Sequence, residues 1–319
     1  MQTIRFSIAA AAAALLAACG GGSDGDNTTP PFFTGFAGGD VELRFEAQAG
    51  GSIATCGTTI SGIGTGKVDA RVQDLRFHVA NVVFITASGA EVPLALKMKP
   101  FADDFWNAKN ASDSLTLIDL EDGSADCAGG TTATNAVITG TVPAGEYIAV
   151  KMTVGVPESL NHLDPFAADT PLALTSTALG WNWTTGRIFS KIEVTDPAKA
   201  TTPTWSAPVF TSHLGALNCT GDPAAGTPAN CAIPNRMLFT LGSSAAMFDP
   251  TKQKIVVDLQ GLFAGNDVTI NTAGTASGCM SALDDPECGP MFAAMQIDRA
   301  TGLPINGGAA QTVFKAADR

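Results

Sequence analysis

Apolar and polar residues alternate with a period of two along much of this chain. The alternation is clearest in VELRFEA (41–47) and VQDLRFHVANVVFITA (72–87), where β-branched and aromatic residues recur at every second position. In an extended strand this spacing sends one row of side chains to a core and the other row to the opposite face. The same pattern predicts further strands at 114–120, 136–142, 147–156, 187–194, 237–241 and 254–259.

Turn-forming residues separate these stretches, as in VPAGEY and ITASGAE. Helical expectations are weaker and fall at NHLDPFAAD (161–169), GLFAG (261–265) and CGPMFAAM (288–295). No repeat with a period of 20 to 50 residues is present. We therefore predict a mainly β fold, an antiparallel sandwich or barrel-like domain with long, disulfide-stapled loops and few short helices.

The first residues predict export from the cytoplasm. One arginine, a short apolar run and LAAC give residues 1–18 the form of a lipoprotein signal peptide, with Cys19 as the lipidated first residue. Gly20 follows, where an Asp would favour the inner membrane, so we expect anchoring at the outer membrane, facing the periplasm or the exterior. Residues 19–38 are rich in Gly, Asp and Pro and predict a flexible tether. Residues 39–319 then form a single β domain, with lipid as the membrane attachment.

Charge and cysteine content narrow the function classes. The chain has 30 acidic and 18 basic residues, a net charge of −12, which argues against binding nucleic acid. Besides Cys19 there are six cysteines, an even number in an oxidising compartment, which predicts three disulfides among fifteen pairings. Short spacings favour two local pairs and leave one long-range pair. The favoured pairs are Cys219 with Cys231, Cys279 with Cys288, and Cys56 with Cys127.

Catalytic signatures are missing, and we do not expect an enzyme. The sequence has no G-x-S-x-G, H-E-x-x-H, Walker loop or dinucleotide fingerprint. Its candidate metal ligands are His162, which follows a strand, and His213, near a predicted disulfide, together with Met280 and Met291. Imidazole suits copper, and thioether sulfur suits Cu(I) in particular. An ordinary loop imidazole and a core methionine are the alternatives for these residues.

Trp181-Asn182-Trp183 is the most informative motif. If the run is a strand, both indoles lie on one face and Asn182 on the other. An indole nitrogen only donates, so an intact Trp cannot bind a metal through it. Oxidative ring opening to kynurenine would create an aniline nitrogen and a ketone oxygen with available lone pairs. Simple packing of two tryptophans is the alternative.

Many short motifs, in order, give the chain a resemblance to one family. They are CGTT (56–59), LRFHVANVVF, LIDLEDGSADC, TGTVPAGEY, VGVPESLNH, GWNWTTGRIFSKIE, SHLGALNC, CAIPNR and GCMSALDDPECGPMF. The chain resembles the MbnP family, also called metallo-mystery-pair four-Cys-motif proteins, from about residue 40 to residue 297. The family's usual G-Y-K-F after W-x-W is GRIFSK here, and Leu179 stands where Met is common.

The resemblance implies a β fold with a role in copper homeostasis and one copper, as Cu(I), bound at a kynurenine. Trp181 corresponds to the tryptophan that becomes kynurenine, through a partner di-haem enzyme of the cytochrome c peroxidase/MauG superfamily (MbnH-like). Family members complete the site with a His, a Met and solvent. We rank His213 and His162 above His78, because the family usually has Tyr at that position, and Met280 above Met291. Trp183 is then a second aromatic that relays oxidising equivalents or packs beside residue 181.

Two other function classes stay open. A lipid-anchored β binding module without a metal could stack Trp181, Trp183 and Trp205 on a sugar or polymer. An enzyme using paired carboxylates is the third class, although no spacing singles out such a pair.

Overall fold

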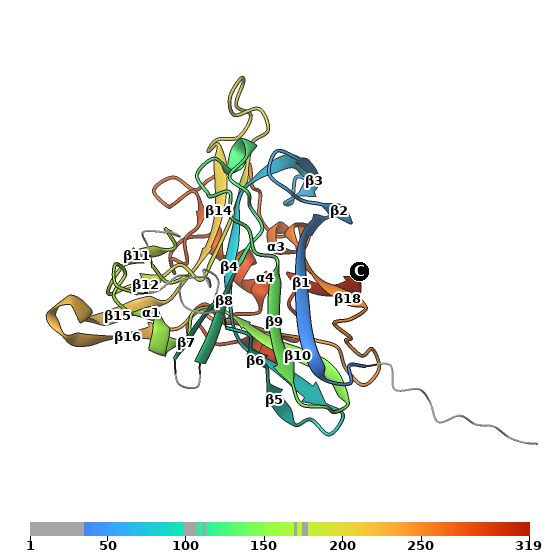
Figure 1. Cartoon of the computed structure of the whole chain (residues 1–319). Helices are drawn as coiled ribbons and strands as arrows, with labels where there is room; N and C mark the ends of the chain where they lie inside the picture. The colour runs from blue at the N-terminus through green and yellow to red at the C-terminus, as the bar shows by residue number, and fades with distance from the viewer. Residues whose placement is uncertain (1–34, 99–106, 111–112, 169–170, 174–177) are drawn as a thin grey trace, which may run out of the picture. The chain divides into compact units, whose positions relative to one another are not determined.

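Two β-sheets carry most of the secondary structure. The computed structural model describes residues 35–98, 107–110, 113–168, 171–173 and 178–319 (Figure 1). The predicted signal peptide, Cys19 and nearly all of the predicted tether therefore lie outside the described residues. None of the helices in the described part of the chain has the length and apolar character needed to cross a membrane.

The smaller sheet has six strands and is built around β1. Its strands are, in order, β20 (Phe314–Asp318), β18 (Gln253–Asp258), β1 (Gly39–Ala49), β9 (Val137–Val142) and β6 (Ala95–Leu96), with β2 (Ser52–Ile53) beside β1. β1 pairs with β18 in parallel and with β9 antiparallel.

The larger sheet has ten strands, and the long strand β4 organises it. Its main order is β17 (Met237–Leu241), β10 (Tyr147–Val154), β4 (Val68–Thr86), β13 (Ser190–Thr195), β14 (Val209–Leu214) and β19 (Gly278–Cys279). Also in this sheet are β3 (Thr59–Ile63), β5 (Glu91–Pro93), β8 (Asp113–Asp119) and β7 (Asn107–Asn110).

Short elements complete the described fold. Two hairpins are formed by β11 (Gly180–Asn182) with β12 (Gly186–Arg187), and by β15 (Leu217–Asp222) with β16 (Thr227–Ile233). The helices are α1 (Glu158–Asn161), α3 (Leu259–Phe263) and α4 (Cys288–Met295), with 3-10 turns η2 (Ala125–Cys127), η3 (Pro223–Ala225) and η4 (Ile305–Gly308). The helix expected over 161–169 is wrong, since α1 ends at Asn161 and turns follow.

The hydrophobic core lies between the two sheets. Phe77 of β4 contacts Phe45 of β1 and Phe314 of β20, with ring centroids 5.7 and 5.5 Å apart. Phe239 of β17 stacks on Phe314 at 4.3 Å. Aromatic contacts of this kind add to the free energy gained from burying the rings. One face of β4 therefore packs in the hydrophobic core, and its other face points away from that core.

Three disulfides hold the loops, and they match the favoured pairing. Cys56 pairs with Cys127 across 71 residues, whereas the Cys219–Cys231 and Cys279–Cys288 bonds close short segments. The mainly β architecture with few short helices is also as expected from the period-two pattern.

Candidate metal centre

The face of β4 that points away from the core is polar and yet buried. Leu75 and Phe77 face the core, while Asp74, Arg76 and His78 alternate with them on the other side and are at most 3% exposed. Burying charges is costly unless each is paired and hydrogen-bonded. A covered polar row on a central strand is therefore a candidate for function.

Neighbouring strands extend this row by direct register. Arg76 lies opposite Lys191 of β13, and Lys191 lies opposite His213 of β14. Asp74 and Glu193 are opposed in the same way one rung along. We call these six side chains the polar face: Asp74, Arg76, His78, Lys191, Glu193 and His213.

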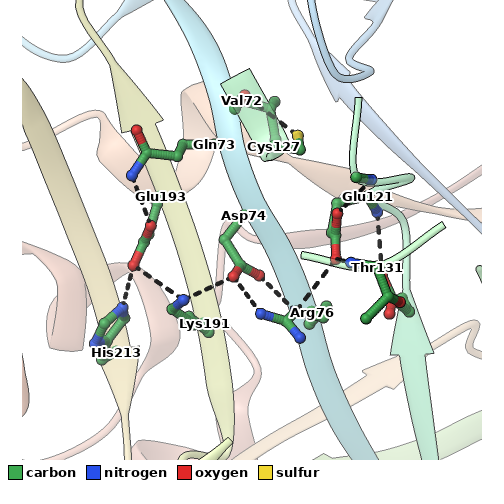
Figure 2. Close-up of polar contacts among 12 residues, drawn as sticks. Val72, Gln73, Asp74, Arg76, Glu121, Cys127, Thr131, Lys191, Glu193 and His213 are labelled. Atoms are coloured by element: carbon green, nitrogen blue, oxygen red, sulfur yellow. Dashed lines mark hydrogen bonds and ion pairs between the residues drawn. The ribbon is translucent and has the colours of Figure 1, made fainter. Parts of the chain in front are cut away.

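Ion pairs run across the polar face (Figure 2). Arg76 Nε donates to Asp74 Oδ1 at 2.8 Å and lies 3.7 Å from Glu121 Oε1. Lys191 Nζ lies 2.8 Å from Asp74 Oδ2 and 3.6 Å from Glu193 Oε1. The ion pairs join three carboxylates, Asp74, Glu121 and Glu193, through two cations, Arg76 and Lys191.

His213 ends the chain of ion pairs. Its Nε2 lies 2.8 Å from Glu193 Oε1, and the imidazole is 7% exposed (Figure 2). Burial alone would raise the pKa of Glu193, but the His213 hydrogen bond and the Lys191 charge outweigh it and lower that pKa. Glu193 is thus a carboxylate that accepts a hydrogen bond from His213 Nε2–H. The lone pair of a neutral His213 then resides on Nδ1, as in metal-binding histidines oriented by a carboxylate.

Trp181 lies over the backbone just after β14. A Cβ on Gly215, two residues after His213, would stand 2.1 Å from Cζ3 of the Trp181 ring. Only a glycine therefore lets the indole rest on the backbone there. The indole also packs against a small apolar cluster of Leu117, Leu179 and Ile188.

The conditional expectation of a strand through both tryptophans fails at Trp183. β11 ends at Asn182, whose Oδ1 accepts from Thr185 N at 2.7 Å and closes a turn over residues 183–185. Trp183 Nε1 donates to His162 O at 2.9 Å, and His162 Nδ1 lies 3.3 Å from Trp183 O. The hydrogen bond from the Asn182 side chain stabilises a turn, and this turn ends the strand before Trp183.

His162 is directed at a disulfide. Its Nε2 lies 3.0 Å from Asn161 Nδ2 and 3.4 Å from Cys231 Sγ. His162, Cys219 and Cys231 form one of two potential metal-binding groups in the described part of the chain; the other is Cys56, Glu121 and Cys127. In both groups the sulfurs are joined in a disulfide, which removes the thiolates that a metal would need.

A buried arginine anchors the segment that carries His162. The Arg187 guanidinium is 1% exposed and donates to the carbonyls of Leu172, Asn161 and Leu163 at 2.6–3.1 Å. Asn161 Oδ1 also accepts from Arg187 N at 2.9 Å. Burial lowers the pKa of Arg187 to about 10, so the cation persists at neutral pH.

The two candidate methionines lie in different surroundings. Cys279 is in register with Ser212, and Ser281 Oγ donates to His213 O at 2.9 Å and accepts from Gly215 N at 3.1 Å. Met280, between them, therefore belongs to a segment that runs alongside the end of β14, and it is partly buried. Met291 belongs to α4 and is fully buried in the hydrophobic core.

Trp205 is also a core residue. It is 7% exposed and belongs to the main apolar cluster. Its ring is therefore not presented to a sugar, which removes one of the three tryptophans on which a glycan-binding interpretation depends.

These features define a disulfide-stapled β protein whose larger sheet has a buried polar face, with imidazoles among paired charges and a tryptophan packed nearby. The MbnP family model matches residues 38–281, and the chain belongs to the MbnP family. The solved structure of MbnP from Methylosinus trichosporium is similar, with a TM-score of 0.69 and 27% sequence identity over 88% of this chain and 98% of that chain. Among curated proteins no match was found. Membership of this family fits a copper-related protein of the methanobactin system.

Proposed function

We propose that this protein binds one copper, as Cu(I), at residue 181 near the polar face and acts in copper homeostasis. Trp181 is first opened to kynurenine by a partner di-haem enzyme. The chain works outside the cytoplasm as a lipoprotein anchored through Cys19, most simply at the outer membrane. Copper is its cargo, so no catalytic residue is assigned.

The maturation step has a simple balance. Two molecules of hydrogen peroxide, used by the haem partner, each contribute one oxygen atom and leave one water; the two oxygen atoms add across the indole C2–C3 bond, which breaks. Hydrolysis then releases the former C2 as formate and leaves an aniline nitrogen and a ketone on residue 181. The nitrogen lone pair that indole commits to its ring becomes available to a metal.

The observation that carries the proposal is the arrangement around His213. His213 Nε2–H donates a hydrogen bond to Glu193, which leaves the lone pair of Nδ1 available to a metal. Trp181 rests on Gly215, two residues further along, and Met280 belongs to the segment that runs alongside the end of β14. An aniline nitrogen, an imidazole and a thioether form a donor set that suits Cu(I). His162 and Met291 fit less well, because one contacts a disulfide and the other packs in the core.

The test compares two tryptophans of one motif. We expect Trp181→Phe, co-produced with the haem partner, to lose tight copper binding and keep the three disulfides, because only the ligand precursor is removed. Copper per chain and Cu(I) affinity, measured against a chromophoric chelator, provide the readout. Trp183→Phe is the matched control. It keeps Trp181, so chains in which mass spectrometry shows kynurenine at residue 181 should bind copper as the parent does. Parental copper affinity in Trp181→Phe would refute the proposal.

A further inference from the structure

His78 of β4 carries a buried nitrogen without a partner. The side chain is 0% exposed, and its Nε2 has no hydrogen-bond partner among the described residues. Buried polar atoms are nearly always satisfied by protein or ordered water, so an orphan needs an explanation. The mechanism of copper binding proposed above does not use this atom.

The orphan nitrogen is also prepared as an electron-pair donor. His78 Nδ1 lies 3.2 Å from Ile188 O, a carbonyl that can only accept, so Nδ1 bears the proton and Nε2 the lone pair. Burial lowers the pKa of His78 to about 4, and the backbone groups of Ile188, Phe189 and Pro171 offset that lowering only in part. None of these groups forms a hydrogen bond of normal geometry with Nε2. The imidazole is therefore neutral at physiological pH. A backbone carbonyl fixing the tautomer of a neutral imidazole is the usual arrangement in metal-binding histidines.

The position of His78 brings it to the surroundings of Trp181. On the neighbouring strand β8, Leu117 lies opposite His78, and Leu117 belongs to the apolar cluster on which the Trp181 indole packs. On the other side His78 N donates to Phe189 O, and Phe189 N donates to Leu214 O, directly before Gly215. His78 and the indole above Gly215 thus occupy the same level of the sheet and the same face.

Nearby charge limits the kind of ion this nitrogen could hold. The Arg187 guanidinium is close enough to His78 to help lower its pKa. At equal distance a divalent cation is repelled by that charge twice as strongly as a monovalent one. The surroundings therefore favour Cu(I) over a divalent metal.

We propose that His78 Nε2 is a second imidazole ligand of the copper held at residue 181. The inference rests on the proposed function, since it concerns the same metal. It makes the copper set of this protein richer in nitrogen than kynurenine, His213 and Met280 alone.

The experiment uses the full chain co-produced with its haem partner. His78→Asn keeps a side-chain N–H for Ile188 O and removes Nε2, and His78→Phe fills the space if the first variant unfolds. Val79→Ala, on the core side of the same strand and 1% exposed, is the control for altered packing of β4. X-ray absorption counts imidazoles on copper, and chelator competition gives the Cu(I) affinity.

We expect two imidazoles in the parent, one in either His78 variant, and an affinity loss of about tenfold or more. Val79→Ala should keep both imidazoles. Parental imidazole count and affinity in His78→Asn, as expected if a water satisfies Nε2, would overturn this inference while leaving the copper site standing. A parent protein that takes up no copper would instead overturn the proposed function.

Discussion

At the scale of single residues, the polar face shows how a buried charge becomes useful. Glu193 is stabilised as a carboxylate by Lys191 and by His213, and in return it decides which nitrogen of His213 is free. Burying the charge of Glu193 or of Lys191 without a partner would cost several kcal/mol, on the order of the desolvation penalty of an ion. Pairing therefore positions a ligand as well as stabilising the sheet.

This role of Glu193 can be measured without any metal. Glu193→Gln keeps an oxygen that accepts the His213 proton, whereas Glu193→Leu removes it. We expect nitrogen NMR of the copper-free protein to show the Nε2–H tautomer of His213 in the parent and in Glu193→Gln, and a mixture in Glu193→Leu. Copper affinity should fall by about tenfold in Glu193→Leu and less in Glu193→Gln. An unchanged tautomer in Glu193→Leu would show that Glu193 does not position His213.

Residue types in the sequence could suggest the candidate ligands but could not rank them. Trp181 was indicated by its motif, and His213 and Met280 by copper chemistry and by resemblance, before their proximity was known. His78 ranked low by resemblance to the family. The sequence does not show that a carbonyl engages one of its ring nitrogens and leaves the other without a hydrogen bond. His162 ranked high because nothing in the sequence reveals its contact with the Cys219–Cys231 disulfide.

At the scale of elements, alternation predicted the strands whose one face is core. β1, β4, β8, β9, β10, β17 and β18 fall where the period-two pattern places them. β14 was missed because its sequence, VFTSHL, has three polar residues in succession, so apolar and polar residues do not alternate. The exposed hairpin of β15 and β16 was missed for the opposite reason, since its residues have no apolar row.

The hairpin of β11 and β12 packs on one glycine outside it, Gly215, which lies between β14 and β15. In Gly215→Ala the new methyl group would collide with the Trp181 ring, so we expect the ring to move at a cost of about 1–3 kcal/mol of unfolding free energy. Urea unfolding followed by tryptophan fluorescence measures this. Gly129→Ala is the control, because a Cβ there meets nothing within 4 Å. Equal losses in the two variants would show that the indole does not depend on close contact with Gly215.

At the scale of the whole molecule, the sheets bury the core and the disulfides connect the loops. Counting cysteines and comparing their spacings led to the pairing that the structure has, because two of the bonds are local. Two sheets bury a shared core, and the Cys56–Cys127 bond ties the segment after β8 to the segment before β3. The outer face of the larger sheet is thereby free to hold a polar centre, and that placement could not be predicted from the sequence because it depends on which loops cover the face.

The most direct measurement is mass spectrometry of the mature protein from its native host, intact and as peptides, combined with copper analysis of the same sample. Kynurenine at residue 181 gains one oxygen and loses one carbon relative to Trp, so its peptide should be heavier by about 4 Da. We expect that mass together with one copper per chain. An unmodified Trp181 in a chain that nevertheless retains its copper would contradict the account.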